Sequence, residues 1–247
     1  MRERQLVWDG CLNVRDLGGH ATEDGGHTAF GEVIRADSVR RLSEAGWLQL
    51  LDYGIARIVD LRHADELAAD PPAEVPVEVV HVPVLPDPAW PYWEEIDAVA
   101  DAAGDAAAAR AAVYLEFLDR FDHGFAAAIA AVAEAGDGGV LVHCFAGKDR
   151  TGLVAALLLR LAGVSVADVA ADYALSEANL RAWSEPWIER AADEVERERR
   201  RRTAAAPAAS METVLRELEG RGGAAEYLRA AGVLDAELRR ARDRLRA

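Results

Sequence analysis

The chain has 247 residues, 51% of them hydrophobic, which is enough to form the core of a single domain over residues 1–247. Its 28 basic residues are outnumbered by 43 acidic ones. The net charge of -15 argues against nucleic acid and anionic membrane surfaces as general partners. Local groups must therefore hold any anion that this protein binds.

The sequence predicts neither a signal peptide nor a membrane-spanning segment. The first ten residues, MRERQLVWDG, are charged and no apolar segment follows them. The apolar run GLVAALLLRLAGV is interrupted by Arg160 and is too short to span a bilayer. We expect no integral membrane association, and a cytoplasmic location unless the protein is secreted without a signal peptide.

Four short segments rich in Val and Ile are typical of β-strands. They are residues 32–36, 55–61, 77–84 and 139–144. Helical patterns lie between them, which predicts an α/β fold with a central sheet flanked by helices. The first helix is clearly delimited, because Ser43 is a suitable N-cap and Gly54 lies where a left-handed residue ends a helix.

The middle of the chain alternates between a loop and a helical region. Prolines recur every few residues over 70–91, which predicts an irregular loop with Asp87 near its apex. Over 106–135, aromatic and aliphatic residues lie three and four positions apart. This spacing predicts one long helix or two consecutive ones, with Gly124 as the weak point.

The C-terminal third shows helical patterns and no strand pattern. Residues 196–210 combine an arginine run with an Ala/Pro stretch, which predicts a helix end running into a mobile connection. The arginine run is interpreted either as a solvated helix face or as a basic edge facing an anionic substrate. The tryptophan-bearing stretches 89–96 and 181–195 are typical of amphipathic helices.

The segment HCFAGKDRTG, residues 143–152, lies between a predicted strand and a predicted helix. Gly147 permits an unusual turn between them. A loop in this position directs backbone N–H groups into a concave site at a helix N-terminus, which suits a tetrahedral dianion.

The same segment superficially resembles a nucleotide-binding phosphate loop, G-x-x-x-x-G-K-[ST], but differs from it at two positions. Val142 stands in place of the first glycine, and Asp149 in place of the hydroxyl residue that binds magnesium. The loop has instead Cys144 at its entrance and Arg150 six positions later.

These two side chains predict chemistry on a phosphate. A cysteine is a nucleophile only as thiolate, and a helix N-terminus, N–H donors and a nearby cation all favour the anion. An arginine presents a planar fork that matches two phosphate oxygens. Both side chains face the same centre when the loop curls around one anion.

Lysine and cysteine are rare in this chain. Lys148 is its only lysine, and we interpret it as a compact second cation beside the arginine fork. Cys11 and Cys144 are the only cysteines, which is not a secreted disulfide framework. We interpret Cys11 as a small apolar filler.

The segment HCFAGKDRTG resembles the H-C-x5-R-[ST] signature of cysteine-dependent protein tyrosine phosphatases. Its Lys-Asp pair is similar to that of the bacterial atypical members, which act on phosphotyrosine, phosphoserine/threonine and phosphoinositides. NVRDLGG (13–19), DYALSEANL (172–180) and LRELEGRGGAAEYLRAAGV (215–233) also resemble this subgroup. The resemblance covers nearly the whole chain.

The resemblance implies a role for each residue of the loop. Cys144 is the nucleophile of a phosphocysteine intermediate, Arg150 binds the phosphate, and Thr151 assists the thiolate when the intermediate is hydrolysed. The implied phosphate-binding set is Phe145, Ala146, Gly147, Lys148, Asp149 and Arg150. The implied reaction uses no metal and no cofactor, and its substrates are phosphorylated proteins or phosphoinositides.

Two carboxylates are candidates for the general acid that protonates the leaving group. Asp87 lies in a Leu-Pro-Asp sequence that resembles the Trp-Pro-Asp acid loop of tyrosine phosphatases, and Asp149 lies within the signature loop. We favour Asp87 as the general acid, with Asp149 either orienting Arg150 or sharing the proton transfer. Leu85 replaces the tryptophan of the family's loop, and Asp87 could also be a carboxylate that caps a turn.

The remaining predictions concern support and access. His143 is expected to orient the loop, and scaffolding or packing at strand ends is expected for Asn13, Arg15, Asp16 and Asp60. Segments at about 89–105 and 183–210 are candidate lids over the site. The other histidines show no metal-ligand spacing.

Two other functional classes remain open from the sequence. A sulfurtransferase or arsenate reductase also uses a thiolate in an anion-binding loop. The Arg-Thr-Gly ending disfavours the sulfurtransferase, and the scarcity of further cysteines disfavours the reductase. A catalytically weak module that binds phosphorylated partners is the non-enzymatic alternative. The sequence does not indicate an oligomeric state.

Overall fold

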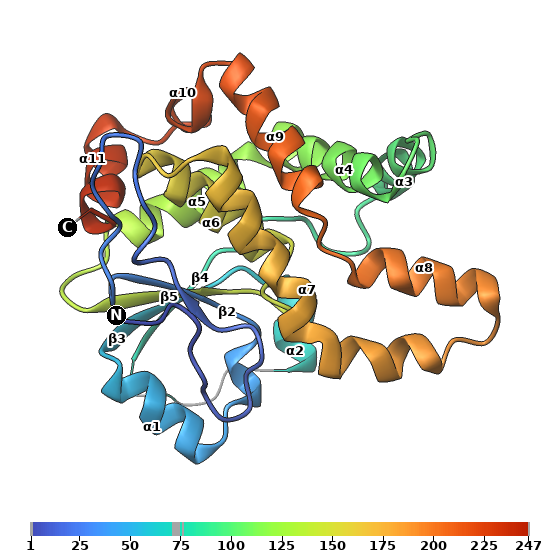
Figure 1. The fold of residues 1–247 in the computed structure, drawn as a ribbon, viewed down its shortest axis with the longest axis horizontal. Coiled ribbons are helices and arrows are strands. Elements are labelled where there is room, and N and C mark those ends of the chain that lie inside the picture. Colours follow the sequence, from blue (N-terminus) through green and yellow to red (C-terminus); the bar gives the residue numbers. More distant parts are fainter. Residues whose placement is uncertain (1, 71–74, 76, 247) are drawn as a thin grey trace.

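A computed structural model describes residues 2–70, 75 and 77–246 and has a central five-stranded sheet (Figure 1). Its strands in spatial order are β1 (Arg15–Asp16), β2 (Val33–Ala36), β5 (Gly139–His143), β3 (Ile55–Asp60) and β4 (Glu78–His81). β1 pairs antiparallel with β2, and the other pairs are parallel. β5 is central, so the segment that follows it emerges at the middle of one sheet edge.

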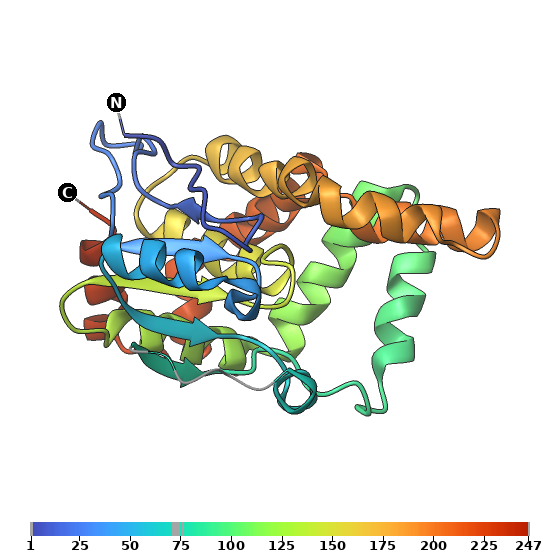
Figure 2. The same ribbon diagram turned by 90° about the horizontal axis from the view of Figure 1, so that it is seen from below.

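Helices cover both faces of the sheet (Figures 1 and 2). Before β5 the chain forms a 3-10 turn η1 (Val39–Arg41) and helices α1 (Glu44–Asp52), α2 (Ala64–Ala69), α3 (Trp93–Asp101), α4 (Ala106–Arg120) and α5 (Asp122–Ala133). After β5 it forms α6 (Arg150–Leu161), α7 (Val166–Glu189), α8 (Glu194–Ala204), α9 (Ala208–Gly220), α10 (Gly223–Ala230) and α11 (Asp235–Arg244).

The core is divided by the sheet into two parts. Val140 and Val142 of β5 pack with α5 and α6, whereas Leu141 between them packs on the opposite face with Leu50 of α1. This alternation follows from the two-residue period of a strand. Because β5 is covered on both faces, all five of its residues are buried and the loop after it starts from a rigid support.

The predicted α/β fold, the strand segments and the all-helical C-terminal third are confirmed. The short strand β1 and helix α2 were not anticipated. The proline-rich segment 70–91 is irregular in part, although β4 lies within it, and residues 71–74 and 76 fall outside the described residues. Ser43 caps α1 as predicted, accepting a hydrogen bond from the backbone N–H of Gly46.

Two details of the helical predictions are wrong. The chain between 106 and 135 breaks at Phe121, not at Gly124, which lies inside α5. A side chain at Gly124 would lie 2.8 Å from the Val84 backbone, so this glycine allows a close approach of two segments. The predicted connection over 196–210 is mostly helical, since α8 continues to Ala204 and α9 begins at Ala208.

The second half of α7 and the whole of α8 form a hairpin that projects from the body of the molecule (Figures 1 and 2). Within the part of the chain that the structure describes, no helix is long and apolar enough to cross a membrane.

Candidate active site

The signature loop, defined here as residues 144–149, connects the end of β5 to the start of α6. Gly147 has a φ of +65°, and a Cβ at this position would lie 2.3 Å from the carbonyl oxygen of Ala36 at the end of β2. Glycine is therefore required here by both its conformation and its contact. The Phe145 carbonyl accepts a hydrogen bond from the Ser38 N–H at 3.0 Å, which ties the loop to the segment after β2.

Two side chains hold the next carbonyl groups of the loop. The Asn13 side-chain amide donates to the carbonyl oxygens of Ala146 and Gly147, both at 3.1 Å. The Arg35 guanidinium donates to the Gly147 carbonyl at 2.9 Å. In a trans peptide the N–H group points opposite to the carbonyl group. Fixing these carbonyls against the body therefore turns the following N–H groups away from it, as an anion cradle requires.

A buried ion cluster supports these two side chains. Asp172 of α7 pairs with Arg15 at 3.1 Å and with Arg35 at 2.8 Å, and all three are almost fully buried. Arg15 also donates to the Asn13 side-chain oxygen. Burial would raise the pKa of Asp172, but the two guanidinium groups outweigh it and hold this pKa far below the ordinary value. Asp172 and Arg35 were not assigned roles from the sequence.

Arg150 is held by a carboxylate that the sequence reasoning missed. Both terminal nitrogens of its guanidinium donate to Glu66 of α2, one of them at 2.9 Å. Burial opposes ionisation of Glu66, but the hydrogen bonds and charge of Arg150 lower its pKa overall. The Glu66 carboxylate also accepts from the His63 N–H at 2.7 Å, which fixes its position. The Glu66 carboxylate thus fixes the orientation of the arginine fork that would bind phosphate.

Asp149 lies in a dense polar environment. Its carboxylate accepts from Arg110 at 2.8 Å and from the Tyr114 hydroxyl at 2.6 Å, and it lies 3.7 Å from the Lys148 ammonium. Burial raises the pKa of Asp149, yet these two cations and the tyrosine lower it below the ordinary value. The Tyr114 hydroxyl lies 2.9 Å from that of Tyr173, whose pKa is raised to about 12 by burial and by Asp149.

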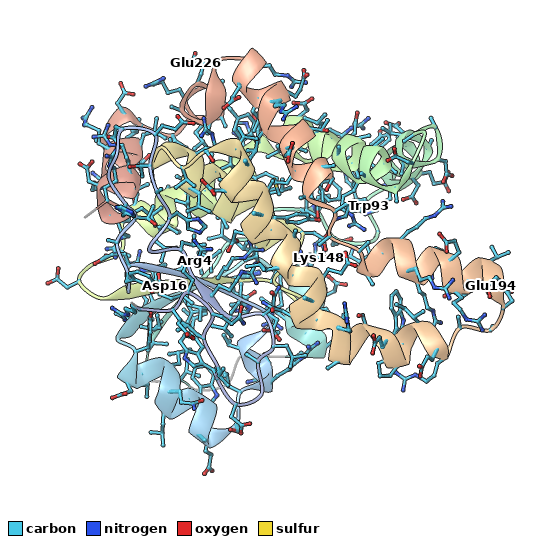
Figure 3. All side chains as sticks on the ribbon, in the orientation of Figure 1. Arg4, Asp16, Trp93, Lys148, Glu194 and Glu226 are labelled. Carbon is cyan, nitrogen blue, oxygen red and sulfur yellow. The ribbon has the colours of Figure 1, made fainter. Side chains whose placement is uncertain are left out.

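Lys148 is buried and points at the end of α8 near the body of the molecule (Figure 3). Its ammonium donates to the carbonyl oxygens of Thr203, Ala204 and Ala205, the last two at 3.4 and 3.2 Å. Burial lowers the pKa of Lys148, partly offset by Asp149.

The structure places Cys144 beside these groups but covers it, since only 2% of its surface is exposed. The neighbouring Phe145 is 42% exposed and packs on Trp183 of α7, with ring centroids 5.7 Å apart. The Arg41 guanidinium lies 5.1 Å from both ring centroids. Thr151 is fully buried, and its hydroxyl has no hydrogen-bond partner among the described residues.

Two predicted supporting residues contact the end of β5. The His143 Nδ1 lies 3.0 Å from the Cys144 carbonyl oxygen, and its Nε2 lies 3.6 Å from Asp60. Burial lowers the pKa of His143, which favours the neutral imidazole. Asp60 is itself bound by Arg62 at 2.7 Å. Both residues therefore brace the start of the loop.

Asp16 and Asp87 lie outside this arrangement. Asp16 binds the backbone N–H groups of Gly18 and Gly31 at 2.7 Å, and it lies well apart from Lys148 in Figure 3. The Asp87 carboxylate is exposed and accepts from the Ala89 N–H at 2.7 Å, the capping contact expected of a turn residue. Its loop is tied to α2, because the Leu85 carbonyl lies 3.2 Å from the His63 Nδ1.

No group of three or more metal-ligating side chains occurs among residues 2–70, 75 and 77–246. The charged side chains around the signature loop are arginines and a lysine, together with the carboxylates that pair with them. Such a site suits binding of a phosphate dianion and attack on it by a thiolate.

Comparisons with known proteins agree with this chemistry. Residues 6–247 match the model of the tyrosine phosphatase family. A tyrosine-protein phosphatase of Nostoc commune is 30% identical over 222 residues, covering 86% of this chain and 73% of that protein. A putative tyrosine-protein phosphatase of Cupriavidus necator is 31% identical over 68% of this chain and 61% of its own length. The triple specificity protein phosphatase PtpB of Mycobacterium tuberculosis is 30% identical over 66% of each chain.

Proposed function

The chain belongs to the tyrosine phosphatase family, and on this premise we propose that it hydrolyses phosphotyrosine through a phosphocysteine intermediate on Cys144. Family membership makes the chain a phosphoric monoester hydrolase. The proposed mechanism is supported by the scaffolded loop, which begins at Cys144 and is followed by Arg150, whose guanidinium is oriented by Glu66.

In the first step, the Cys144 thiolate attacks phosphorus. A sulfur–phosphorus bond forms, the bond from phosphorus to the ester oxygen breaks, and that oxygen takes a proton from the general acid. The Arg150 guanidinium and the loop N–H groups bind the non-bridging oxygens, whose charge they stabilise most when these oxygens become equatorial. Glu66 keeps the arginine fork in register with them.

In the second step, water attacks phosphorus, the sulfur–phosphorus bond breaks, and inorganic phosphate leaves. The residue that gave its proton in the first step accepts one from the water. The Thr151 hydroxyl, which is buried and has no partner among the described residues, donates to the departing thiolate in this proposal.

We favour Asp87 as the general acid. Asp149 is engaged by Arg110 and Tyr114, and its lowered pKa disfavours the protonated form that a general acid needs. In this proposal Asp149 positions the neighbouring cations. Asp87 must approach the loop from its present turn, which a movement of the segment 89–105 would permit.

The proposal extends to substrates and access. Phosphoserine, phosphothreonine and phosphoinositides are further proposed substrates, supported by the printed name of the triple specificity relative. The segments 89–105 and 183–210 are proposed as lids, supported by the burial of Cys144 and by Trp183 packing on Phe145.

The test is phosphate release from phosphotyrosine, phosphoserine and phosphothreonine peptides and from phosphoinositides, with a chelator present throughout. Wild type, Cys144→Ser and the matched control Cys11→Ser are compared. We expect turnover only when Cys144 is intact, with no loss in chelator. Tight substrate binding without turnover would favour the binding module, and thiosulfate or arsenate turnover alone would favour the other thiolate enzymes.

A further inference from the structure

Helix α8 is attached to the body in an unusual way. None of its residues is buried, and Val195 near its start is 81% exposed. Along its length, Arg200 contacts Trp187 of α7, with the guanidinium 5.1 Å from the ring centroid. Apolar burial therefore contributes little to the position of α8, which is held by polar contacts such as the hydrogen bond from Arg200 to the Trp187 carbonyl oxygen.

The C-terminal end of α8 is bound by two cations from the active site. The Lys148 ammonium donates to three successive carbonyls, those of residues 203–205. The Arg110 guanidinium, which also pairs with Asp149, donates to the carbonyl oxygens of Arg202 and Thr203. We call this set of contacts between Lys148, Arg110 and the carbonyls of residues 202–205 the α8 latch.

The physical basis of the latch is the open end of a helix. The last carbonyl groups of a helix have no partner within the helix and carry the negative end of its dipole, so a cation at that end is stabilised. An ammonium has three N–H donors, and the three carbonyls satisfy them. These contacts offset the free-energy cost of burying the charged ammonium of Lys148.

We propose that the carbonyl end of α8 competes with the phosphate group of the substrate for Lys148, so that α8 restrains access to the site until a phosphate enters the loop. This inference rests on the proposed function, because it places a phosphoryl group in the loop that contains Lys148. A dianion in the loop draws the ammonium away from the carbonyls, and α8 then loses part of its attachment to the body. Coupling of this kind is reciprocal, so a weakened latch strengthens phosphate binding.

The test uses two proline substitutions in α8. Thr203→Pro removes a backbone N–H and unwinds the last turn, which displaces the latch carbonyls. Val195→Pro lies in the first turn, where proline is tolerated, and is the matched control. Both side chains are exposed, so neither substitution removes a core contact, and a thermal unfolding scan of each variant confirms that the body of the protein stays folded at the temperature of the binding measurements.

The parent is Cys144→Ser, so that binding is measured without turnover. Inorganic phosphate is titrated by calorimetry, and hydrogen exchange of residues 194–204 is followed with and without it. We expect Thr203→Pro to bind phosphate about 5-fold to 10-fold more tightly than Val195→Pro, within the usual range of coupling between two sites. Phosphate should also accelerate exchange of α8 in the parent.

Three results would overturn the latch: equal phosphate affinity in the two proline variants, α8 exchange that phosphate leaves unchanged, or no detectable phosphate binding in any variant. Turnover of phosphate esters by the wild type is measured separately. Turnover without coupling would overturn the latch alone, and coupling without turnover would overturn the proposed function alone.

Discussion

The first half of α7 and the hairpin formed by its second half with α8 both contain many charges, but they use them differently. Asp172 in the first half is fully buried between Arg15 and Arg35, and this cluster holds the signature loop. The pairs along α8 are more exposed to water; in the pair of Arg202 with Glu198, for example, 68% and 49% of the two side chains are exposed. Burial, and not the number of ion pairs, separates the cluster that holds the signature loop from helix α8, for which we propose a change of position.

The substitution Asp172→Asn is the strongest test of the difference between the buried ion cluster and the exposed ion pairs of α8. This change leaves Arg15 and Arg35 buried without a compensating charge, and breaking a buried pair costs about 3–5 kcal/mol. We expect a loss of this size in the free energy of unfolding, measured by urea denaturation at neutral pH. The loop scaffold should fail with it, so phosphatase activity should fall even at temperatures where the variant remains folded. A loss below about 1 kcal/mol would contradict the role assigned to this cluster.

Glu66→Gln tests an ion pair of intermediate burial. The side chains of Arg150 and Glu66 are 12% and 21% exposed, so water screens this pair less than those of α8. Because a charge-assisted pair of this kind contributes about 1.5–3 kcal/mol, we expect kcat to fall roughly 10-fold to 100-fold. The matched control is Glu78→Gln, which removes the exposed partner of Arg57. A change confined to KM, or an equal effect in the control, would exclude Glu66 as a positioning residue.

The stability of the folded protein should also depend on pH, through the buried residue His143. Burial lowers the pKa of its imidazole below 6.5, so between the folded and unfolded pKa values the unfolded chain binds more protons than the folded one. Stability due to this residue is therefore complete above pH 6.5 and is lost as the pH falls below it. Urea denaturation of wild type and His143→Gln from pH 8 to pH 5 should show a smaller decline in the variant. The exposed His27→Gln is the control, and an equal decline in all three proteins would refute the assignment.

The unit from β5 to α6 was predictable because its signals are local. A buried strand, a glycine-containing loop and an apolar helix follow one another within residues 139–161, and the position of Cys144 and Arg150 on the loop follows from that order. Gly124 shows the limit of the same reasoning. Sequence identifies a glycine as a weak point in a helix, whereas in the structure Gly124 lies inside α5, where it allows the Val84 backbone to approach, and the break lies at Phe121.

Asn13 was expected to support the loop and contacts it, but three other residues of the loop's surroundings were not predictable, for a physical reason. In the sequence, Glu66, Arg110 and Asp172 look like solvated charges, and only the tertiary arrangement brings them to the loop and its supports from distant parts of the chain. Asp87 shows the opposite case, because its sequence context predicts a catalytic acid and the structure places its carboxylate in a turn. Local sequence thus indicates the reacting groups, while long-range packing determines how they are held.

The smallest expected effect lies in α8, at Glu198→Gln. The Glu198 carboxylate lies 3.2 Å from Arg202 and 3.7 Å from Arg201, and 49% of its side chain is exposed. Exposed pairs contribute about 0–1 kcal/mol because water and salt screen them. We expect the free energy of unfolding to change by less than about 0.5 kcal/mol, with unchanged kcat. The α8 latch uses backbone carbonyls, so it should survive this substitution and phosphate affinity should stay constant. If the free energy of unfolding fell as much as in Asp172→Asn, the exposed pairs of α8 would stabilise the fold as strongly as the buried cluster does. The proposed difference between the two regions would then be wrong.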